Sequence, residues 1–201
     1  LDGLDALVAT GLVRQRGSRL VFEQEGIRSA ALELVVGRAE LQDLHRRLAD
    51  AWTQLGKSSG TDVDLPVGKH RLASAAPDLA LAPLLRSCRT ALQEGRAVLA
   101  LDVSRQASQA AEHSNLAMAR VEAIQRRVEA LLELDRPEEA GEALEELLHS
   151  THMDRRTKAR LRLLGADVAM ALGKLDAARP LLDEAATTFE ATRDRLGIID
   201  T

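Results

Sequence analysis

Three alanines recur at nearly constant intervals in the second half of the chain. Ala140 follows Ala100 by 40 positions, and Ala178 follows Ala140 by 38 positions. Seven positions after each comes another small or apolar residue: Ala107, Leu147 and Ala185. A small residue is needed where the two helices of a hairpin approach closely, and repeats of about 34–40 residues are typical of stacked helix pairs. The pattern therefore predicts a series of helical hairpins.

The composition also favours helices. Of the 201 residues, 45% are hydrophobic and 29% charged, but only 1% are aromatic: Phe22, Trp52 and Phe189. Strands prefer β-branched and aromatic residues, whereas Ala, Leu, Glu and Arg favour helices. We therefore expect a mainly α-helical protein. The apolar content argues against overall disorder.

Charge and cysteine content limit the partners and the compartment. The net charge of −4 and the pI near 5.8 disfavour a general nucleic-acid binder. Cys88 is the single cysteine, so no internal disulfide forms, which suits a reducing compartment. No signal peptide or membrane-length apolar run is visible. We expect a cytoplasmic protein, and because the chain begins with Leu1 inside an apparent helix, we expect a fragment of a longer one.

The segment 1–55 is expected to form one unit. The sequence predicts helices over 2–10 and 24–36, with a β-hairpin over 11–22 that turns at Gly17 and Ser18. Helix, hairpin and helix in this order form the second half of a winged-helix domain. Apolar residues spaced by three and four predict a further amphipathic helix over 39–55.

A linker rich in Gly, Ser and Asp is expected over residues 56–66, followed by helical hairpins over 67–201. The repeat length is typical of a tetratricopeptide-like α-solenoid. The last repeat is expected to be incomplete, because Leu196, Ile198 and Ile199 begin a helix without a partner. The predicted helices of this part are 67–76, 79–93, 95–112, 116–134, 137–149, 155–172 and 176–194.

Four segments, 4–13, 22–30, 44–49 and 69–75, resemble motifs of the signal-transduction ATPases with numerous domains (STAND proteins). The family patterns, in the same order, are "Leu-x-x-Leu-x-x-x-Gly-Leu-Leu", "Phe-x-His-x-x-Ile-Arg", "Leu-His-x-x-Leu-Ala" and "Ala-x-His-x-x-x-Ala". The group includes LuxR-type and maltose-type activators and kinase–ATPase fusions. The resemblance implies a P-loop ATPase core upstream, which would bind ATP or ADP, while no cofactor is expected in this chain.

The resemblance also implies roles for single residues. In the family, a histidine after "Phe-x" reaches the β-phosphate of bound ADP, and here Gln24 has that place. Gln can donate a hydrogen bond but has no charge. Arg28 matches the family's arginine, and the alternative for both residues is a solvated helix start. His45 and His70 match family positions and are expected to pack at helix junctions.

Residues 51–58 match a permissive P-loop pattern, with Ala51 in place of the first glycine. A functional P-loop needs a strand before it and a helix after it. Here an amphipathic helix precedes the pattern, so we expect only a helix end, closed by Gly56 and Lys57.

No catalytic or metal-binding pattern is apparent. The five histidines include no pair at i, i+4 spacing, and the single Cys88 cannot supply a cysteine zinc site. Cys88 lies among leucines in a predicted helix, which predicts a small buried hydrophobe. We therefore expect that the chain is not itself an enzyme.

Charges occur in two neighbouring blocks. Residues 133–146 hold seven acidic residues and one basic, and residues 155–162 hold five basic residues and none acidic. The blocks could compensate each other across the stack, or the basic block could bind an acidic peptide or a nucleic acid. The candidate surface residues are Arg155, Arg156, Lys158, Arg160 and Arg162.

The sequence favours a regulatory, protein-interaction module: the winged helix would couple to the upstream ATPase core, and the repeats would bind a protein, peptide or inducer. The alternatives are a plain scaffold and winged-helix DNA binding, which is disfavoured because residues 1–10 contain no basic residue. Self-association through the apolar C-terminal end is a further expectation, and no membrane is expected as a partner.

Overall fold

A computed structural model describes residues 8–11, 13–16, 19–22, 38–150 and 153–192. They form a mainly helical chain with one small antiparallel hairpin. Strands β1 (Val13–Arg16) and β2 (Arg19–Phe22) pair with Val13 opposite Phe22 and Arg16 opposite Arg19. The predicted hairpin is thus confirmed.

Several expectations fall on residues that the structure does not describe. They are the helix over 24–36, most of the helix over 2–10, and the C-terminal Leu196, Ile198 and Ile199. Of residues 1–36, the structure describes the two strands and residues 8–11, so the winged helix stays a prediction.

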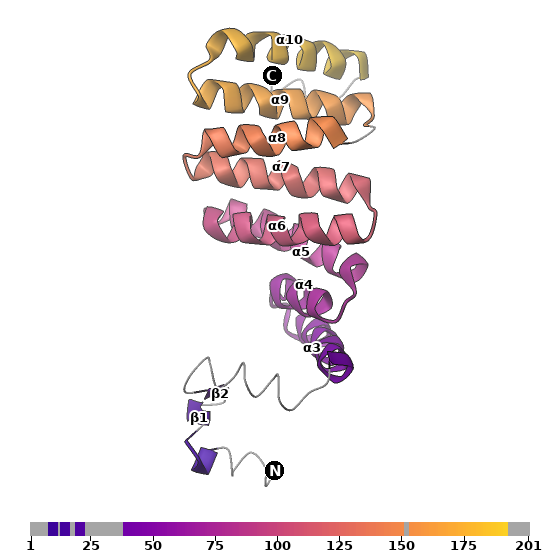
Figure 1. Cartoon of the computed structure of the whole chain (residues 1–201), viewed down its shortest axis with the longest axis vertical. Coiled ribbons are helices and arrows are strands. Elements are labelled where there is room, and N and C mark those ends of the chain that lie inside the picture. The colour runs from indigo at the N-terminus through magenta and orange to yellow at the C-terminus, as the bar shows by residue number, and fades with distance from the viewer. Residues whose placement is uncertain (1–7, 12, 17–18, 23–37, 151–152, 193–201) are drawn as a thin grey trace.

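The remaining helices lie side by side in chain order, from the purple α3 to the yellow α10 (Figure 1). Each one packs against the next, and α7 also contacts α5 and α9. Their bounds are α3 (Arg38–Ser59), α4 (Asp64–Ala73), α5 (Pro77–Gln93), α6 (Ala97–His113), α7 (Ala117–Glu133), α8 (Pro137–Ser150), α9 (Arg155–Ala171) and α10 (Leu175–Thr192).

The linker expected over 56–66 is much shorter in the structure. Helix α3 continues to Ser59 and α4 begins at Asp64, so only the segment 60–63 separates them. The hydroxyls of Ser58 and Ser59 donate to the carbonyl of Leu55 at 3.0 and 2.7 Å. Polar side chains that suggested a linker thus bond to the backbone of the last helical turn.

Three-residue turns join five of the helix pairs. The middle residue of each turn has a left-handed backbone, and the residue after it donates its N–H to a carbonyl five positions earlier, as from Arg96 to Ala91 at 2.8 Å. This arrangement closes a helix end with its last carbonyls satisfied. The left-handed residues, with φ of 57°, 67°, 53°, 56° and 70°, are Ala75, Gly95, Asn115, Asp135 and Gly173.

The first four left-handed residues lie 20 positions apart, and α5, α6 and α7 each have 17 residues. The longer interval seen in the sequence, from Ala100 to Ala140, therefore consists of two equal halves, each a helix and a turn. From Asp135 to Gly173 the interval is 38 positions, because α8 has 14 residues, whereas α9 again has 17.

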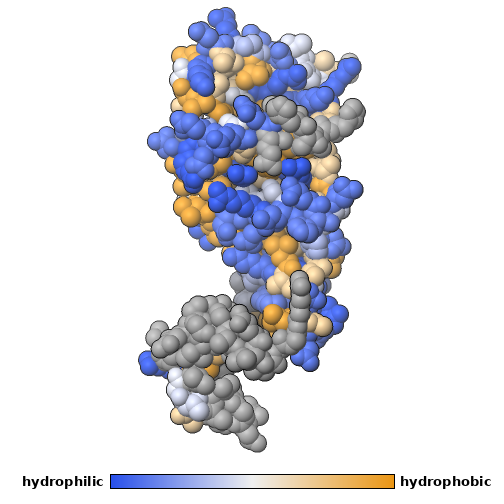
Figure 2. All heavy atoms as spheres, in the orientation of Figure 1, coloured by the Kyte–Doolittle hydropathy of each residue, from blue (hydrophilic) through white to orange (hydrophobic). Residues whose placement is uncertain are grey.

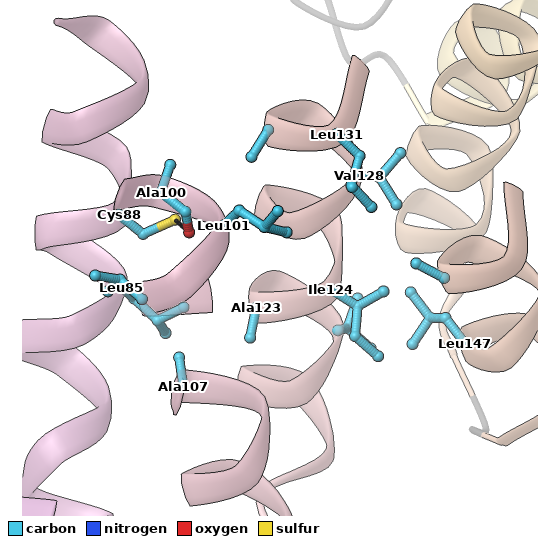
Figure 3. Packing of buried hydrophobic residues seen from close by; sticks show 14 of the residues in the cluster. Leu85, Cys88, Ala100, Leu101, Ala107, Ala123, Ile124, Val128, Leu131 and Leu147 are labelled. Carbon is cyan, nitrogen blue, oxygen red and sulfur yellow. Dashed lines mark hydrogen bonds between the residues drawn. The ribbon is translucent and has the colours of Figure 1, made fainter. Parts of the chain in front are cut away.

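The alanines of the repeat lie where the sequence predicts close helix approach. Ala100, Ala140 and Ala178 are each the fourth residue of their helix, in α6, α8 and α10, and at most 2% of their surface is exposed. Figure 3 shows Ala100 of α6 beside Cys88 of α5. It also shows Ile124 of α7 facing Leu147 of α8. The same core cluster extends from α5 to α9. Small residues thus bring neighbouring helices into contact along the stack.

The turn geometry predicts opposite effects for two substitutions. Ala75 has a left-handed backbone, which costs an L-residue other than Gly roughly 1–2 kcal/mol. Replacing Ala75 by Gly removes this cost, but Gly loses more conformational freedom on folding, and this loss offsets part of the gain. We expect Ala75→Gly to raise the free energy of unfolding by about 0.5–1 kcal/mol and Gly95→Ala to lower it by a similar amount, measured by urea denaturation.

Ala82 supplies the control, since it is exposed within α5. Ala82→Gly should lower the free energy of unfolding by about 1 kcal/mol, the ordinary cost of glycine within a helix. Equal destabilisation by Ala75→Gly and Ala82→Gly would contradict the left-handed turn at Ala75.

Candidate interaction surfaces

The five basic residues of the second charge block lie on α9, in its first two turns. Arg155, Arg156, Lys158 and Arg160 are exposed, and Arg162 is partly buried; together these five residues are named the α9 basic surface. Arg155, Lys158 and Arg162 follow at spacings of three and four, which places them on one side of the helix.

Asp154 fixes the start of this helix. Its Oδ1 accepts the backbone N–H of Thr157 at 2.7 Å, which satisfies a donor that has no partner within the helix. The same hydrogen bond lowers the pKa of the Asp154 carboxyl, because it favours the ionised form. The N-cap therefore fixes where the α9 basic surface begins.

The other end of the surface is paired with α10. Arg162 Nε lies 2.6 Å from Glu184 Oε2. Arg162 is thus paired with the following helix, whereas compensation between the two charge blocks would pair it with α8; for the rest of the block, compensation stays a prediction. Such partly exposed pairs contribute about 0–1 kcal/mol.

A hollow of about 260 Å³ lies next to Arg162, between α8, α9 and α10. Its apolar wall includes Leu144, Leu161 and Leu181; Lys174 and Arg162 add two positive charges to the lining, and Glu145 adds one negative charge. Gly165 lines it as well, and a Cβ at that position would lie 3.3 Å from Leu144. The α9 basic surface thus borders a small apolar depression, a combination that suits an acidic segment with an apolar side chain.

A second charged surface, which sequence reasoning missed, crosses α4, α5 and α7. Arg86 donates to both carboxylate oxygens of Asp64 at 2.7 and 2.9 Å, and Arg89 Nη2 donates to Glu122 Oε1 at 3.1 Å. These partners are 22 and 33 positions apart, so no local pattern reveals them. One feature of the sequence points to Arg86: it lies 40 positions before Arg126, so the two arginines have equivalent places in the repeat, in α5 and α7.

Figure 2 shows hydrophilic side chains over much of the stack on the face in view, with hydrophobic patches along its edges. Among the described residues, the most exposed large apolar side chains are Val98 (72%) and Leu175 (67%). They lie in the first turns of α6 and α10, next to the short turns. The face in view is thus mainly hydrophilic, and exposed apolar side chains lie beside the turns at Val98 and Leu175.

The histidines of the two family-like motifs come together. His45 of α3 and His70 of α4 are 25 positions apart in the chain, yet their Nδ1 atoms are 2.9 Å apart and their ring centroids 5.1 Å apart. This confirms that both pack at a helix junction. Gln24 and Arg28, the implied nucleotide contacts, lie outside the described residues.

The P-loop-like residues 51–58 lie within α3. A phosphate-binding loop needs free backbone N–H groups, and in a helix interior these groups bond to carbonyls. The structure therefore excludes a P-loop here. The helix end expected at Gly56 and Lys57 lies slightly later, at Ser59, and is followed by Gly60 with a left-handed backbone.

Cys88 is fully buried in α5, as the sequence predicts. Its Sγ donates to the carbonyl of Ala100 at 3.4 Å in the neighbouring helix. Burial raises the pKa of the Cys88 thiol to about 11, since the thiolate would lose its hydration. The thiol is therefore protonated and shielded at neutral pH.

Among the described residues, no three His, Cys, Asp or Glu side chains are close enough together to hold a metal ion. None of the described helices is both long and apolar enough to span a membrane.

Comparisons with protein-family models, with curated proteins and with solved structures give no match for this chain.

Burial of Cys88 predicts a slow thiol reaction. In the native protein at pH 8, we expect an aromatic disulfide reagent to modify Cys88 at least 100 times more slowly than in the same protein unfolded in urea, because the reactive form is the thiolate. The released chromophore measures both rates. Modification of the native protein at the unfolded rate would contradict the buried position.

Proposed function

We propose that this chain is a non-catalytic regulatory and protein-interaction module of a larger STAND-type signalling ATPase. In this proposal α4–α10 form a tetratricopeptide-like α-solenoid that binds a protein, peptide or inducer. The support is the regular recurrence of a helix and a left-handed turn, at Ala75, Gly95, Asn115 and Asp135, which stacks the helices in chain order. A stack of this kind offers extended charged faces for binding.

The α9 basic surface is the proposed partner site. The positive end of the helix dipole lies at the N-terminus, where acidic residues stabilise a helix and basic residues destabilise it. Helices α3, α4, α5, α8 and α10 have an acidic residue in the first turn and α6 and α7 have none, whereas α9 begins with Arg155 and Arg156 after its N-cap Asp154. This single observation favours binding over stability: after the N-cap, the first turn of α9 has positive charge where the stability of the helix favours negative charge.

The partner chemistry follows from this surface. Guanidinium and ammonium groups bind carboxylates, and the hollow beside Arg162 has an apolar wall. An acidic protein segment with an apolar side chain fits both features. The surface has no aromatic residue on which bases could stack, so a protein partner is favoured over a single-stranded nucleic acid.

The contact between His45 and His70 supports the coupling part of the proposal. It joins two of the four family-like motifs into one unit at the start of the stack. In the proposal, the preceding winged helix, with Gln24 and Arg28, would contact ADP or ATP in an upstream core. Partner binding would then change with the nucleotide state through a domain rearrangement.

A plain scaffold is the second candidate, favoured by the regularity of α5–α7, each of 17 residues. The two candidates differ in one measurable property of the full-length protein. A switch predicts that replacing the P-loop lysine of an upstream ATPase core changes partner binding, whereas a scaffold predicts no change. A complete reading frame without an ATPase core would refute the switch.

Charge reversal tests the partner surface. We expect Arg155→Glu with Lys158→Glu to weaken binding of a fluorescent acidic peptide, such as a short glutamate-rich peptide with one leucine, at least tenfold in anisotropy titrations at low salt. The matched control is Arg105→Glu with Arg179→Glu, which makes the same change in net charge at exposed positions on α6 and α10. Equal weakening by both pairs would contradict a specific surface.

The same variant has an opposite expected effect on stability. Because negative charge is favourable in the first turn of a helix, Arg155→Glu with Lys158→Glu should raise the free energy of unfolding by about 0.5–1.5 kcal/mol at low salt. Urea denaturation at two salt concentrations measures it, and the gain should shrink as salt rises. Loss of stability would show that these cations have a structural role instead.

A further inference from the structure

The junction of α3 and α4 contains a hydrogen bond that depends on protonation. Helix α3 packs on α4, where Ala49 is fully buried. Two polar contacts cross the junction: Arg71 Nη2 donates to Asp50 Oδ1 at 2.6 Å, and His45 Nδ1 lies 2.9 Å from His70 Nδ1. The first contact is an ion pair, whereas the second is between two imidazole rings.

The bond between two Nδ1 atoms requires one donor and one acceptor. A neutral imidazole with its proton on Nε2 has an accepting Nδ1, whereas an imidazolium donates from both nitrogens. The pair can therefore bond when both rings are neutral or when one is charged. When both are charged, two N–H groups and two positive charges face each other across 2.9 Å, and the contact becomes repulsive.

Several neighbouring carboxylates among the described residues are already paired with cations. On α3, Asp43 is bonded to Arg46 and Arg47, and Asp50 is bonded to Arg71 of α4. Lys69 Nζ of α4 lies 3.8 Å from Asp102 Oδ2 of α6. Of the residues on α5, which packs on the other side of α4, Arg86 is bonded to Asp64 and Arg89 to Glu122. The remaining charged side chain of α5 is Asp78, and it is exposed.

Burial and the neighbouring ring both oppose the charging of His70. Desolvation lowers the pKa of His70 below 6.5, and repulsion from His45 lowers it further. The unfolded chain therefore binds this proton more readily than the folded one. The free energy that holds the junction is fully present above pH 6.5 and decreases as the pH falls below it.

We propose that His45 and His70 form a pH-sensitive latch, which holds α3 on α4 at neutral pH and weakens that junction in mildly acidic solution. The response is local, because the core cluster that runs from α5 to α9 contains no residue of α3. Protonation would thus loosen the first helix of the stack and leave the following helices packed. The inference rests on the junction geometry and does not require the proposed partner surface.

Trp52 provides the readout, since it is the single tryptophan, lies on α3 and is partly buried. We expect its emission to shift to longer wavelength between pH 7.5 and 5, with a midpoint below pH 6.5. His70→Gln, which keeps a hydrogen-bond donor but cannot become charged, should abolish the shift. The control His113→Gln removes an exposed histidine of α6 and should leave the shift unchanged.

Hydrogen exchange in the wild-type chain tests the same proposal without a variant. After correction for the intrinsic pH dependence of exchange, amides of α3 should lose protection at least tenfold between pH 7.5 and 5.5, while those of α7 keep theirs. Equal protection of α3 at both pH values, or an unchanged emission shift in His70→Gln, would overturn the latch. A loss of protection in α3 and α7 together would also overturn it, because the response would then be global.

Discussion

The structure depends on one backbone constraint: the chain must reverse direction within a three-residue turn at five helix ends. Such a turn needs a left-handed residue, which Gly95 and Gly173 adopt without strain and Asn115 and Asp135 adopt with little. Three successive helices have 17 residues each, and the turns between them have three residues each, so the same unit recurs every 20 positions. A regular stack follows from this constant spacing.

Close packing follows from the same spacing. The fourth residue of α6, α8 and α10 is alanine each time, and each of these alanines is buried in the stack, where a small side chain allows close approach of the helices. The core is therefore built from alanine, leucine and valine, with Phe189 as its one fully buried aromatic residue among those described. Many charged residues remain exposed on the helices, and several of them form ion pairs between neighbouring helices.

Sequence reasoning predicted what depends on local spacing. The helices after residue 76, the hairpin, the buried Cys88 and the buried alanines all agree with the structure. It failed at residues 56–66, because serine hydroxyls satisfy the helix end there, and it missed the ion pairs of Arg86 and Arg89, because their partners are distant in sequence. It placed His45 and His70 at helix junctions but not against each other, since that contact depends on how α3 crosses α4.

The central claim is that left-handed turns recur at a constant interval and set the stack. Nuclear magnetic resonance tests it most directly, through the HN–Hα scalar couplings and Cα and Cβ chemical shifts of Ala75, Asn115 and Asp135. The account predicts left-handed values at all three residues, between segments with helical shifts. Helical values at these positions would mean that the helices continue through the turns, and would contradict the account.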